Sequence, residues 1–285
     1  MQHVEFGKGG PRWPALGLGT WRYGEERRTH ADEVAALRRA IEIGYRVFDT
    51  AEMYGEGGAE TVLGEAIAGA LAAGDVQRDE LFVVSKVYPH NASRSGVAAA
   101  CDRSRRRLRL DRIDLYLLHW RGSVPLRETL EGFVAEQRAG RIGRWGVSNF
   151  DVDDLEELGA IAGGKACAAN QVQYALRERG VEWDLLPWQQ QRAMPLMAYC
   201  PIDQGRTRGD AVLAAIGARH GATPVQVALA WVLSRPGVMA IPKSAREAHL
   251  RDNFAAASLQ LTPQDHAELD ARFPPPRSKQ ALAMT

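Results

Sequence analysis

Short runs of apolar and β-branched residues recur along the chain, and a stretch with helical periodicity follows nearly every run. Each run ends near a polar residue. This alternation is typical of successive βα units, in which helices connect parallel strands. The predicted strands lie at residues 16–20, 45–49, 81–86, 113–119, 142–149, 168–171, 195–199 and 238–243.

Helical patterns fill the segments between these runs. They cover residues 31–43, 60–71, 96–109, 126–139, 153–162, 184–192, 209–220, 225–234 and 247–256. Residues that favour helix ends agree with these limits. Thr29 or Asp32 can cap the first helix and Gly44 can end it. Asp151 can cap the fifth helix, and Pro224 suits the first turn of the helix that ends near residue 234.

Eight alternations without a Pro/Gly/Ser-rich linker favour a closed (β/α)₈ TIM barrel over a doubly wound sheet, which usually has fewer strands and a second domain. Residues 1–16 are predicted to form an N-terminal β-hairpin that plugs the barrel floor. The tail at residues 273–285 contains three consecutive prolines and is expected to lie over the rim. We therefore expect a single barrel domain over residues 1–285.

Composition excludes several classes of partner. Lys and Arg number 36 against 35 Asp and Glu, for a net charge of +1, so no field favours nucleic acid or an anionic membrane. No segment reaches the roughly 18 apolar residues of a membrane span, and the first residues lack a signal-peptide pattern. We expect a cytoplasmic monomer whose widely spaced Cys101, Cys167 and Cys200 are reduced and mostly buried. The basic run at residues 103–109 reads as a solvated helix face.

Polar residues at the strand ends are the candidates for chemistry, because barrel active sites form where the strands end. Tyr54 follows Asp49 by five positions, at the start of a loop. The strand-end residues are Asp49, Lys86, His119, Ser148, Asn149, Gln171, Tyr199 and Lys243.

A tyrosine beside a lysine and a histidine suggests proton transfer coupled to stabilisation of a developing alkoxide. A phenol has a pKa of about 10, so exchange near pH 7 requires a decrease of about three units. Lys86 on the neighbouring strand can supply at most that decrease, while Asp49 would hold Lys86 charged and weaken its field at Tyr54.

Each residue also has an ordinary structural explanation. His119 could be a core histidine, Tyr54 a surface aromatic, Lys86 a strand end and Asp49 a helix cap. Their joint occurrence at the ends of consecutive strands favours an active site. The sequence contains no metal-binding histidine spacing, nucleophile elbow or phosphate-binding loop, so we expect no metal.

Eight motifs carry a resemblance to a known family. The sequence resembles the aldo-keto reductase superfamily along nearly its whole length, with the motifs in the order of that family. They are GLGTW at 17–21, FDTAEMYG at 48–55, SK at 85–86, DLYLLHW at 114–120, GVSNF at 146–150, NQVQY at 170–174, AYCP at 198–201 and IPKS at 241–244.

The resemblance implies a catalytic tetrad. In it Tyr54 is the general acid, Lys86 lowers its pKa, Asp49 pairs with Lys86, and His119 orients the carbonyl. It also implies NADPH, with the carboxamide on Ser148, Asn149 and Gln171 and the nicotinamide ring stacked on Tyr199. The cofactor contacts it implies are Thr20, Trp21, Asp49, Ser148, Asn149, Gln171, Tyr199, Cys200, Pro201, Ile202, Lys243, Ser244, Arg246, His249 and Asn253. A substrate pocket is expected at Trp21, Tyr54, Tyr88, His119 and Trp120.

Residues 116–123, 141–150, 184–191 and 274–284 are most similar to a bacterial branch with methylglyoxal reductase activity. This similarity implies NADPH-dependent reduction of small aldehydes, ketones or dicarbonyls to alcohols. The alternatives are a reductase of larger aldoses or aromatic aldehydes, and a non-catalytic nicotinamide-binding regulatory subunit.

Two positions depart from the pattern of the family. Cys200 stands where many members have serine, and His249 stands where an arginine often contacts the 2′-phosphate of NADPH. Lys243 and Arg246 remain as phosphate partners, so we expect NADPH to be preferred, with NADH as the alternative cofactor.

Overall fold

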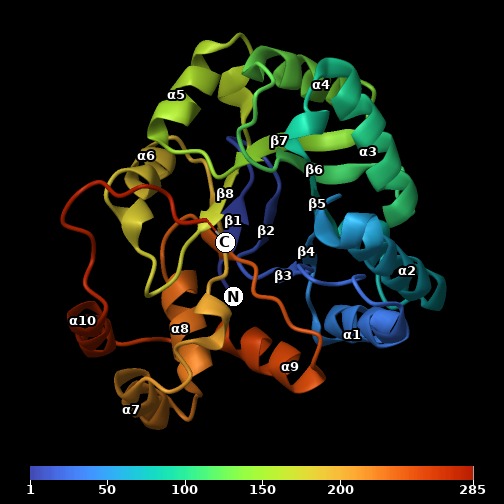
Figure 1. Ribbon diagram of the computed structural model, residues 1–285. Coiled ribbons are helices and arrows are strands. Elements are labelled where there is room, and N and C mark those ends of the chain that lie inside the picture. Colours follow the sequence, from blue (N-terminus) through green and yellow to red (C-terminus); the bar gives the residue numbers. More distant parts are fainter. Residues whose placement is uncertain (285) are drawn as a thin grey trace.

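The computed structural model describes residues 1–284, and its centre is a barrel of parallel strands (Figure 1). Neighbouring strands in the sheet are also neighbours along the chain. The first and last strands meet through parallel bridges between Leu16 and Ala240 and between Gly19 and Lys243, which close the barrel. The strands are β3 (Leu18–Gly19), β4 (Val47–Asp49), β5 (Phe82–Val87), β6 (Ile113–Leu118), β7 (Ile142–Ser148), β8 (Asn170–Gln173), β9 (Leu196–Tyr199) and β10 (Val238–Ala240). The predicted (β/α)₈ architecture is confirmed.

Two glycines allow the barrel to close tightly. A side chain at Gly17 would come within 3.1 Å of Val47 and Ile241 side-chain atoms. At Gly19 it would lie 3.0 Å from the Ile241 carbonyl oxygen. Every residue of β5 and β6 is buried, as expected for parallel strands enclosed by a ring of helices.

Helices surround the strands on the outside of the barrel (Figure 1). They are α1 (His30–Ile43), α2 (Gly58–Ala73), α3 (Arg94–Leu108), α4 (Leu126–Arg138), α5 (Val152–Ala160), α6 (Leu185–Gln191), α7 (Ala211–His220), α8 (Pro224–Leu233), α9 (Glu247–Ala256) and α10 (Pro263–Arg272). Short 3₁₀ segments lie in the connections: η1 (Arg27–Thr29), η2 (Tyr54–Gly57), η3 (Arg78–Glu80), η4 (Pro89–Asn91), η5 (Gly164–Ala166), η6 (Gly180–Glu182) and η7 (Asp203–Gly205). None of the helices within residues 1–284 is both long and apolar enough to cross a membrane.

The expected helix ends are largely correct. Gly44 ends α1 at a φ of 120°, Asp151 caps α5 by accepting the Asp154 amide, and Pro224 begins α8. Thr29 stands at the N-cap of α1, but its side chain makes no capping hydrogen bond there.

The N-terminal hairpin closes the floor of the barrel, as predicted. Strand β1 (His3–Glu5) pairs antiparallel with β2 (Arg12–Pro14). The rings of Phe6 and Trp13 lie 4.6 and 5.3 Å from the ring of Phe82, the first residue of β5. The hairpin therefore packs on the N-terminal side of the sheet, opposite the end where the strand-end residues gather.

The tail crosses from α10 toward the middle of the barrel mouth (Figure 1). Lys279 lies 3.6 Å from Asp153 and 3.5 Å from Asp184. The hydroxyl oxygen of Tyr199 lies 3.4 Å from the carbonyl oxygen of Ala283. Residue 285, the last of the predicted tail, lies outside the described residues.

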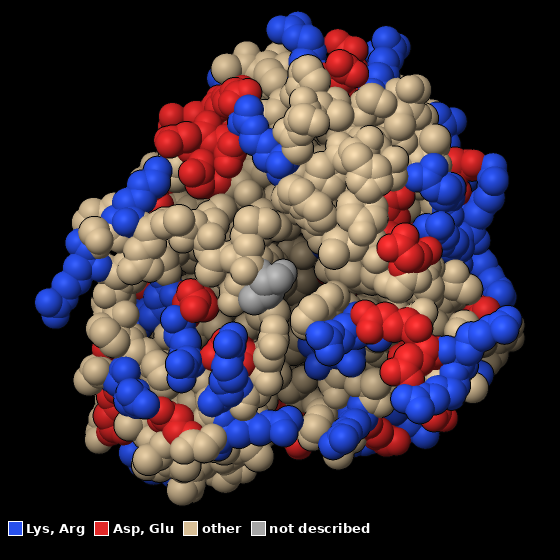
Figure 2. All heavy atoms as spheres, in the orientation of Figure 1, with Lys and Arg blue, Asp and Glu red and all other residues tan. Residues whose placement is uncertain are grey.

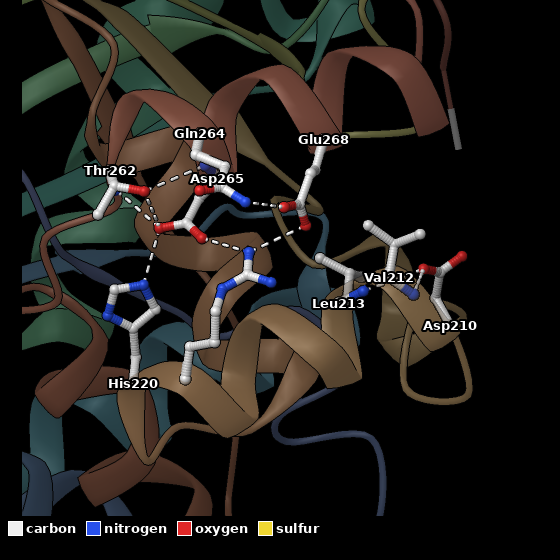
Figure 3. A network of polar contacts seen from close by, with 9 residues as sticks. Asp210, Val212, Leu213, His220, Thr262, Gln264, Asp265 and Glu268 are labelled. Carbon is white, nitrogen blue, oxygen red and sulfur yellow. Dashed lines mark hydrogen bonds and ion pairs between the residues drawn. The ribbon is translucent and has the colours of Figure 1, made fainter.

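Helix α10 was not predicted, because its sequence is mostly polar. A polar network attaches it to α7 (Figure 3). Asp265 is 1% exposed and accepts hydrogen bonds from Arg219 at 2.6 Å and Thr262 at 2.8 Å. His220 Nε2 lies 2.7 Å from the same carboxylate. A threonine cap followed by proline and, three positions on, an aspartate was the local signal for this helix.

Replacing Asp265 with asparagine should destabilise the protein. Burial alone raises the pKa of Asp265, but bonds to Arg219, Thr262 and His220 outweigh burial and hold the pKa well below 3.8. The stabilisation is therefore present above about pH 4 and is lost as the pH falls toward the folded-state pKa. We expect Asp265→Asn to lower the free energy of unfolding by about 3 kcal/mol at pH 7.

Urea denaturation at pH 7 and at successively lower pH measures this loss. The partly exposed Glu268 also contacts Arg219, so Glu268→Gln is the matched control and should change the midpoint little. Equal midpoints for Asp265→Asn and the wild type at pH 7 would contradict the assigned role of the network.

Candidate active site

A cavity of about 840 Å³ opens at the carboxyl ends of the strands. Figure 2 shows this face hollowed near its centre, where uncharged side chains predominate. Most of the predicted site residues line the cavity. These are Trp21, Asp49, Tyr54, His119, Trp120, Ser148, Asn149, Gln171, Tyr199, Cys200, Pro201, Ile202, Lys243, Ser244, His249 and Asn253.

Lys86 lies at the centre of the site but does not line the cavity. Strands β4 and β5 are paired with Asp49 opposite Val84, so Lys86, two residues further on, points to the same side as Asp49. The fully buried ammonium donates to Asp49 Oδ2 at 2.7 Å, to the Thr50 carbonyl at 2.9 Å and to the Tyr54 hydroxyl at 3.2 Å.

Two opposing effects determine the charge on this cluster. Burial lowers the pKa of Lys86, but Asp49 and Tyr54 raise it, and the net pKa lies above 10.5. Burial raises the pKa of Tyr54 more than Lys86 lowers it, so its net pKa lies above 10.0. The decrease of about three units that would bring a phenol near pH 7 is therefore not reached. The cause is desolvation of the phenolate, to which Asp49 adds repulsion. Tyr54 is a protonated donor at neutral pH.

His119 is a neutral ring at the wall of the cavity. Its ring centroid lies 5.7 Å from that of Tyr54, and its pKa is held well below 6.5 by burial and by the charge of Lys86. Nδ1 is buried and has no hydrogen-bond partner among the described residues. An N–H there would be an unsatisfied donor, so hydrogen bonding favours the tautomer protonated on Nε2. His119 can then donate from Nε2.

A hydrogen bond spans the interior of the barrel from β8 to β4. Three strands separate these two on one side and three on the other, so they lie opposite each other. Gln171 Nε2 donates to Asp49 Oδ1 at 2.7 Å, and Ser148 Oγ donates to the Gln171 carbonyl at 2.8 Å. Asp49 is thus held by Lys86 through one oxygen and by Gln171 through the other.

Asn149 joins the histidine to the aromatic side of the cavity. Its backbone has a φ of 59°, a left-handed conformation that asparagine tolerates better than most residues. Its side-chain amide donates to the His119 carbonyl at 3.1 Å, and its oxygen accepts from the Tyr199 hydroxyl at 2.9 Å. The amide groups of Asn149 and Gln171 therefore flank the cavity wall near Asp49 and His119.

Three further predicted residues do not line this cavity. Thr20 is buried and donates from Oγ1 to the Asp49 carbonyl at 3.1 Å, so it supports the strand end. Tyr88 lines a separate cavity of about 330 Å³ and meets the site only through its ring, 5.8 Å from that of Trp120. Arg246 is exposed at the N-cap of α9. These three residues are thus not among those that line the cavity, and the substrate contact expected for Tyr88 and the cofactor contacts expected for Thr20 and Arg246 stay predictions.

Sequence reasoning missed two kinds of lining residue. Some follow the strands by more than a few positions, and others, such as Gly19, Ile241 and Pro242, are uncharged neighbours of predicted site residues at the strand ends. The loop after β9 turns sharply through left-handed residues at Asp203, Gln204 and Gly205 and so returns over the cavity. Because the loops that follow barrel strands build the active site, the position of this loop after a predicted strand was a general signal that it lines the cavity. The missed lining residues are Gly19, Arg22, Met53, Gln204, Gly205, Arg208, Thr223, Pro224, Val225, Ile241, Pro242, Asp252 and Met284.

The three cysteines lie apart from one another. Cys101 and Cys167 are buried, and Cys200 lines the cavity. Over residues 1–284 the side chains form no group of three or more His, Cys, Asp or Glu that could hold a metal ion.

Comparisons with known proteins agree with the motifs and the geometry. The methylglyoxal reductase YeaE of Escherichia coli K12 is 49% identical over 276 residues, which is 95% of this chain and 95% of that protein. The methylglyoxal reductase DkgB of Escherichia coli O157:H7 is 31% identical over 264 residues, with 90% of this chain and 92% of that protein covered. An aldo-keto reductase of Klebsiella pneumoniae, solved in complex with NADPH, has a TM-score of 0.93 and 46% identity, covering 100% of this chain and 99% of that chain.

The profile of the Aldo/keto reductase family matches residues 15–272, which include the whole barrel and every predicted catalytic residue. The chain therefore belongs to the aldo/keto reductase family of oxidoreductases.

Proposed function

We propose that this protein reduces small aldehydes, ketones or dicarbonyls such as methylglyoxal to alcohols, with NADPH as the reductant. One observation carries the proposal: a protonated Tyr54 and a neutral His119 face one cavity, with a charged Lys86 directly behind the phenol. The names of the Escherichia coli relatives support the substrate class, and the Klebsiella complex supports the cofactor.

The cavity residues fit a nicotinamide cofactor. The side-chain nitrogen of Gln171 donates to Asp49, so the side-chain oxygen of Gln171 remains as an acceptor for the carboxamide of the cofactor. Ser148 and Asn149, which are hydrogen-bonded to each other, lie beside Gln171. Tyr199 offers a ring on the same side, while Lys243 provides a cation further along. When bound, the cofactor supplies the hydride.

The protein's own residues handle the proton and the charge on the carbonyl oxygen. His119 donates from Nε2 to that oxygen, which polarises the carbonyl. Tyr54 donates its proton as negative charge develops on the oxygen. The ammonium of Lys86, 3.2 Å from the phenol oxygen, then stabilises the phenolate that remains. Asp49 keeps Lys86 charged and in place.

The substrate side of the cavity is apolar. Trp21, Trp120, Met53 and Met284 line it. Such a wall excludes water from the reacting groups and suits a small carbonyl compound better than a polar sugar.

We also propose that residues 1–285 act as one domain, in a monomer, in the cytoplasm. Among the described residues the exposed large apolar side chains are Met1, Trp183 and Met284, which is few for a stable interface. Light scattering of the purified protein tests the monomer.

Replacing Tyr54 with phenylalanine removes the proton donor but keeps the ring. We expect kcat for methylglyoxal reduction to fall at least about 10²-fold, because general acid catalysis contributes that much, while the Kd for NADPH stays close to the wild-type value. Steady-state kinetics and fluorescence titration measure the two quantities. The control is Tyr116→Phe, which loses a hydroxyl in the core, outside the cavity lining, and should retain wild-type kcat. If Tyr54→Phe keeps more than about a tenth of kcat, Tyr54 is not the acid.

Lys243 should determine the preference for NADPH over NADH. It lines the cavity, whereas Arg246 does not, so Lys243→Met should weaken NADPH binding by about tenfold or more and leave NADH binding nearly unchanged. Arg246→Met is the matched control, and a smaller loss is expected for it. Titration of all three proteins with both cofactors measures the preference. Equal affinity of the wild type for NADH and NADPH would contradict this assignment.

A further inference from the structure

Glu52 is a buried carboxylate two residues before Tyr54 that the mechanism above does not use. It is 5% exposed and does not line the large cavity. Oε1 accepts from the Tyr88 amide at 2.7 Å and from Asn91 Nδ2 at 3.1 Å. Oε2 accepts from Arg103 Nη2 at 3.1 Å. One carboxylate thus binds three donors from two other segments.

In its own segment, Glu52 is the last residue before Tyr54 whose backbone amide is hydrogen-bonded to β5. The Thr50 amide donates to the Val84 carbonyl at 2.9 Å, and the Glu52 amide donates to the Lys86 carbonyl at 3.3 Å. After Glu52 these bonds to β5 cease, and η2 contains residues with left-handed backbone. The position of Tyr54 relative to Lys86 therefore depends on where Glu52 is held.

Glu52 also holds the segment after β5 that supports the substrate wall. The Tyr88 ring meets Trp120 edge-on at 5.8 Å, and Trp120 lies 4.9 Å from the ring of His119. His119 in turn meets Tyr54 at 5.7 Å. Ring contacts therefore lead from Tyr88 through Trp120 and His119 to Tyr54. Glu52 is attached to both ends of this series, because it binds the Tyr88 amide and lies two residues before Tyr54.

Side chains do not fill the space next to Glu52. The second cavity, of about 330 Å³, is lined by polar and charged side chains: Glu52, Glu56, Tyr88, His90, Asn91, Arg103 and Arg107. At this cavity, hydrogen bonds to Glu52 join the two segments. A buried carboxylate is costly unless it is fully paired, so a position that served packing alone would favour an apolar side chain.

Arg103 supplies the charge that Glu52 requires. It belongs to the basic run on α3 that the sequence suggested was a solvated face. Arg107 from the same run lies 3.1 Å from the buried Glu60. Arg106, by contrast, pairs with the partly exposed Asp102 on the same helix. Part of the basic run therefore neutralises buried carboxylates near the active site.

We propose that Glu52 is a positioning residue that fixes the loop of Tyr54 and the Tyr88–Trp120 wall relative to each other. It thereby sets both the position of the proton donor and the width of the substrate pocket. This inference rests on the proposed carbonyl reduction.

Glu52→Gln tests the proposal, because it keeps the size of the side chain and removes its charge. We expect kcat for methylglyoxal to fall by about tenfold, since a small misplacement of the donor is costly, with the Kd for NADPH unchanged. The ratio of kcat/KM for 4-nitrobenzaldehyde to that for methylglyoxal should rise at least about threefold. The reason is that the Tyr88–Trp120 wall is no longer held by Glu52 and can move to admit the larger aromatic substrate. If Glu52 only stabilised the fold, Glu52→Gln would lower the fraction of the protein that binds NADPH. It would then lower the apparent kcat/KM for both substrates by the same factor.

Variants on α3 provide the controls. Arg103→Gln should shift kcat and selectivity in the same direction as Glu52→Gln, and Arg103→Lys, which keeps the charge, should restore them. Arg106→Gln should behave as the wild type. If Glu52→Gln does not fold, Arg103→Gln and Asn91→Ala carry the same test.

Folded Glu52→Gln with wild-type kcat and selectivity would overturn the proposal, as would wild-type behaviour of Arg103→Gln and Asn91→Ala. A wild-type protein that binds NADPH but reduces no carbonyl would instead contradict the proposed function. The two failures are therefore distinguishable.

Discussion

The site depends on one buried ammonium. Lys86 is fully enclosed, and its charge is tolerated because Asp49, the Thr50 carbonyl and the Tyr54 hydroxyl each accept a hydrogen bond from it. Burial, together with this charge, keeps His119 neutral, and the charge partly offsets the desolvation of Tyr54. If the ammonium were lost, the buried carboxylate of Asp49 would keep only the hydrogen bond from Gln171 among the side chains of residues 1–284.

The residues around Lys86 come from separate strands, and the barrel brings them together. Asp49 and Lys86 lie on paired strands, while Gln171 reaches Asp49 from the opposite side of the interior. A residue proposed for the cofactor carboxamide is thereby bonded to the carboxylate that holds Lys86. The binding and proton-transfer parts of the site share one hydrogen-bond network, so neither can be positioned without the other.

Much of this could be predicted from the sequence, because local patterns report local structure. Apolar runs that end in Asp49, Lys86 and His119 mark strand ends, and barrel strands present those ends on one face. Prediction failed where the signal was weak or non-local. Helix α10 has few apolar residues to show a period, and the partners of its buried Asp265 include Arg219 and His220 from the distant α7. The loop after β9 lines the cavity through left-handed turns that its composition does not specify.

The sequence by itself determined the order of the barrel strands and of the helices other than α10, the family, and which side chains stand at the strand ends, since these follow from periodicity and motif. Only the tertiary structure decided the protonation of Tyr54, because the pKa of a phenol depends on the balance between burial and the field of Lys86. It also placed Tyr88 behind Trp120 and not in the cavity, and gave Glu52 its three donors. Such effects arise from distances between segments far apart in the chain, which local patterns do not encode.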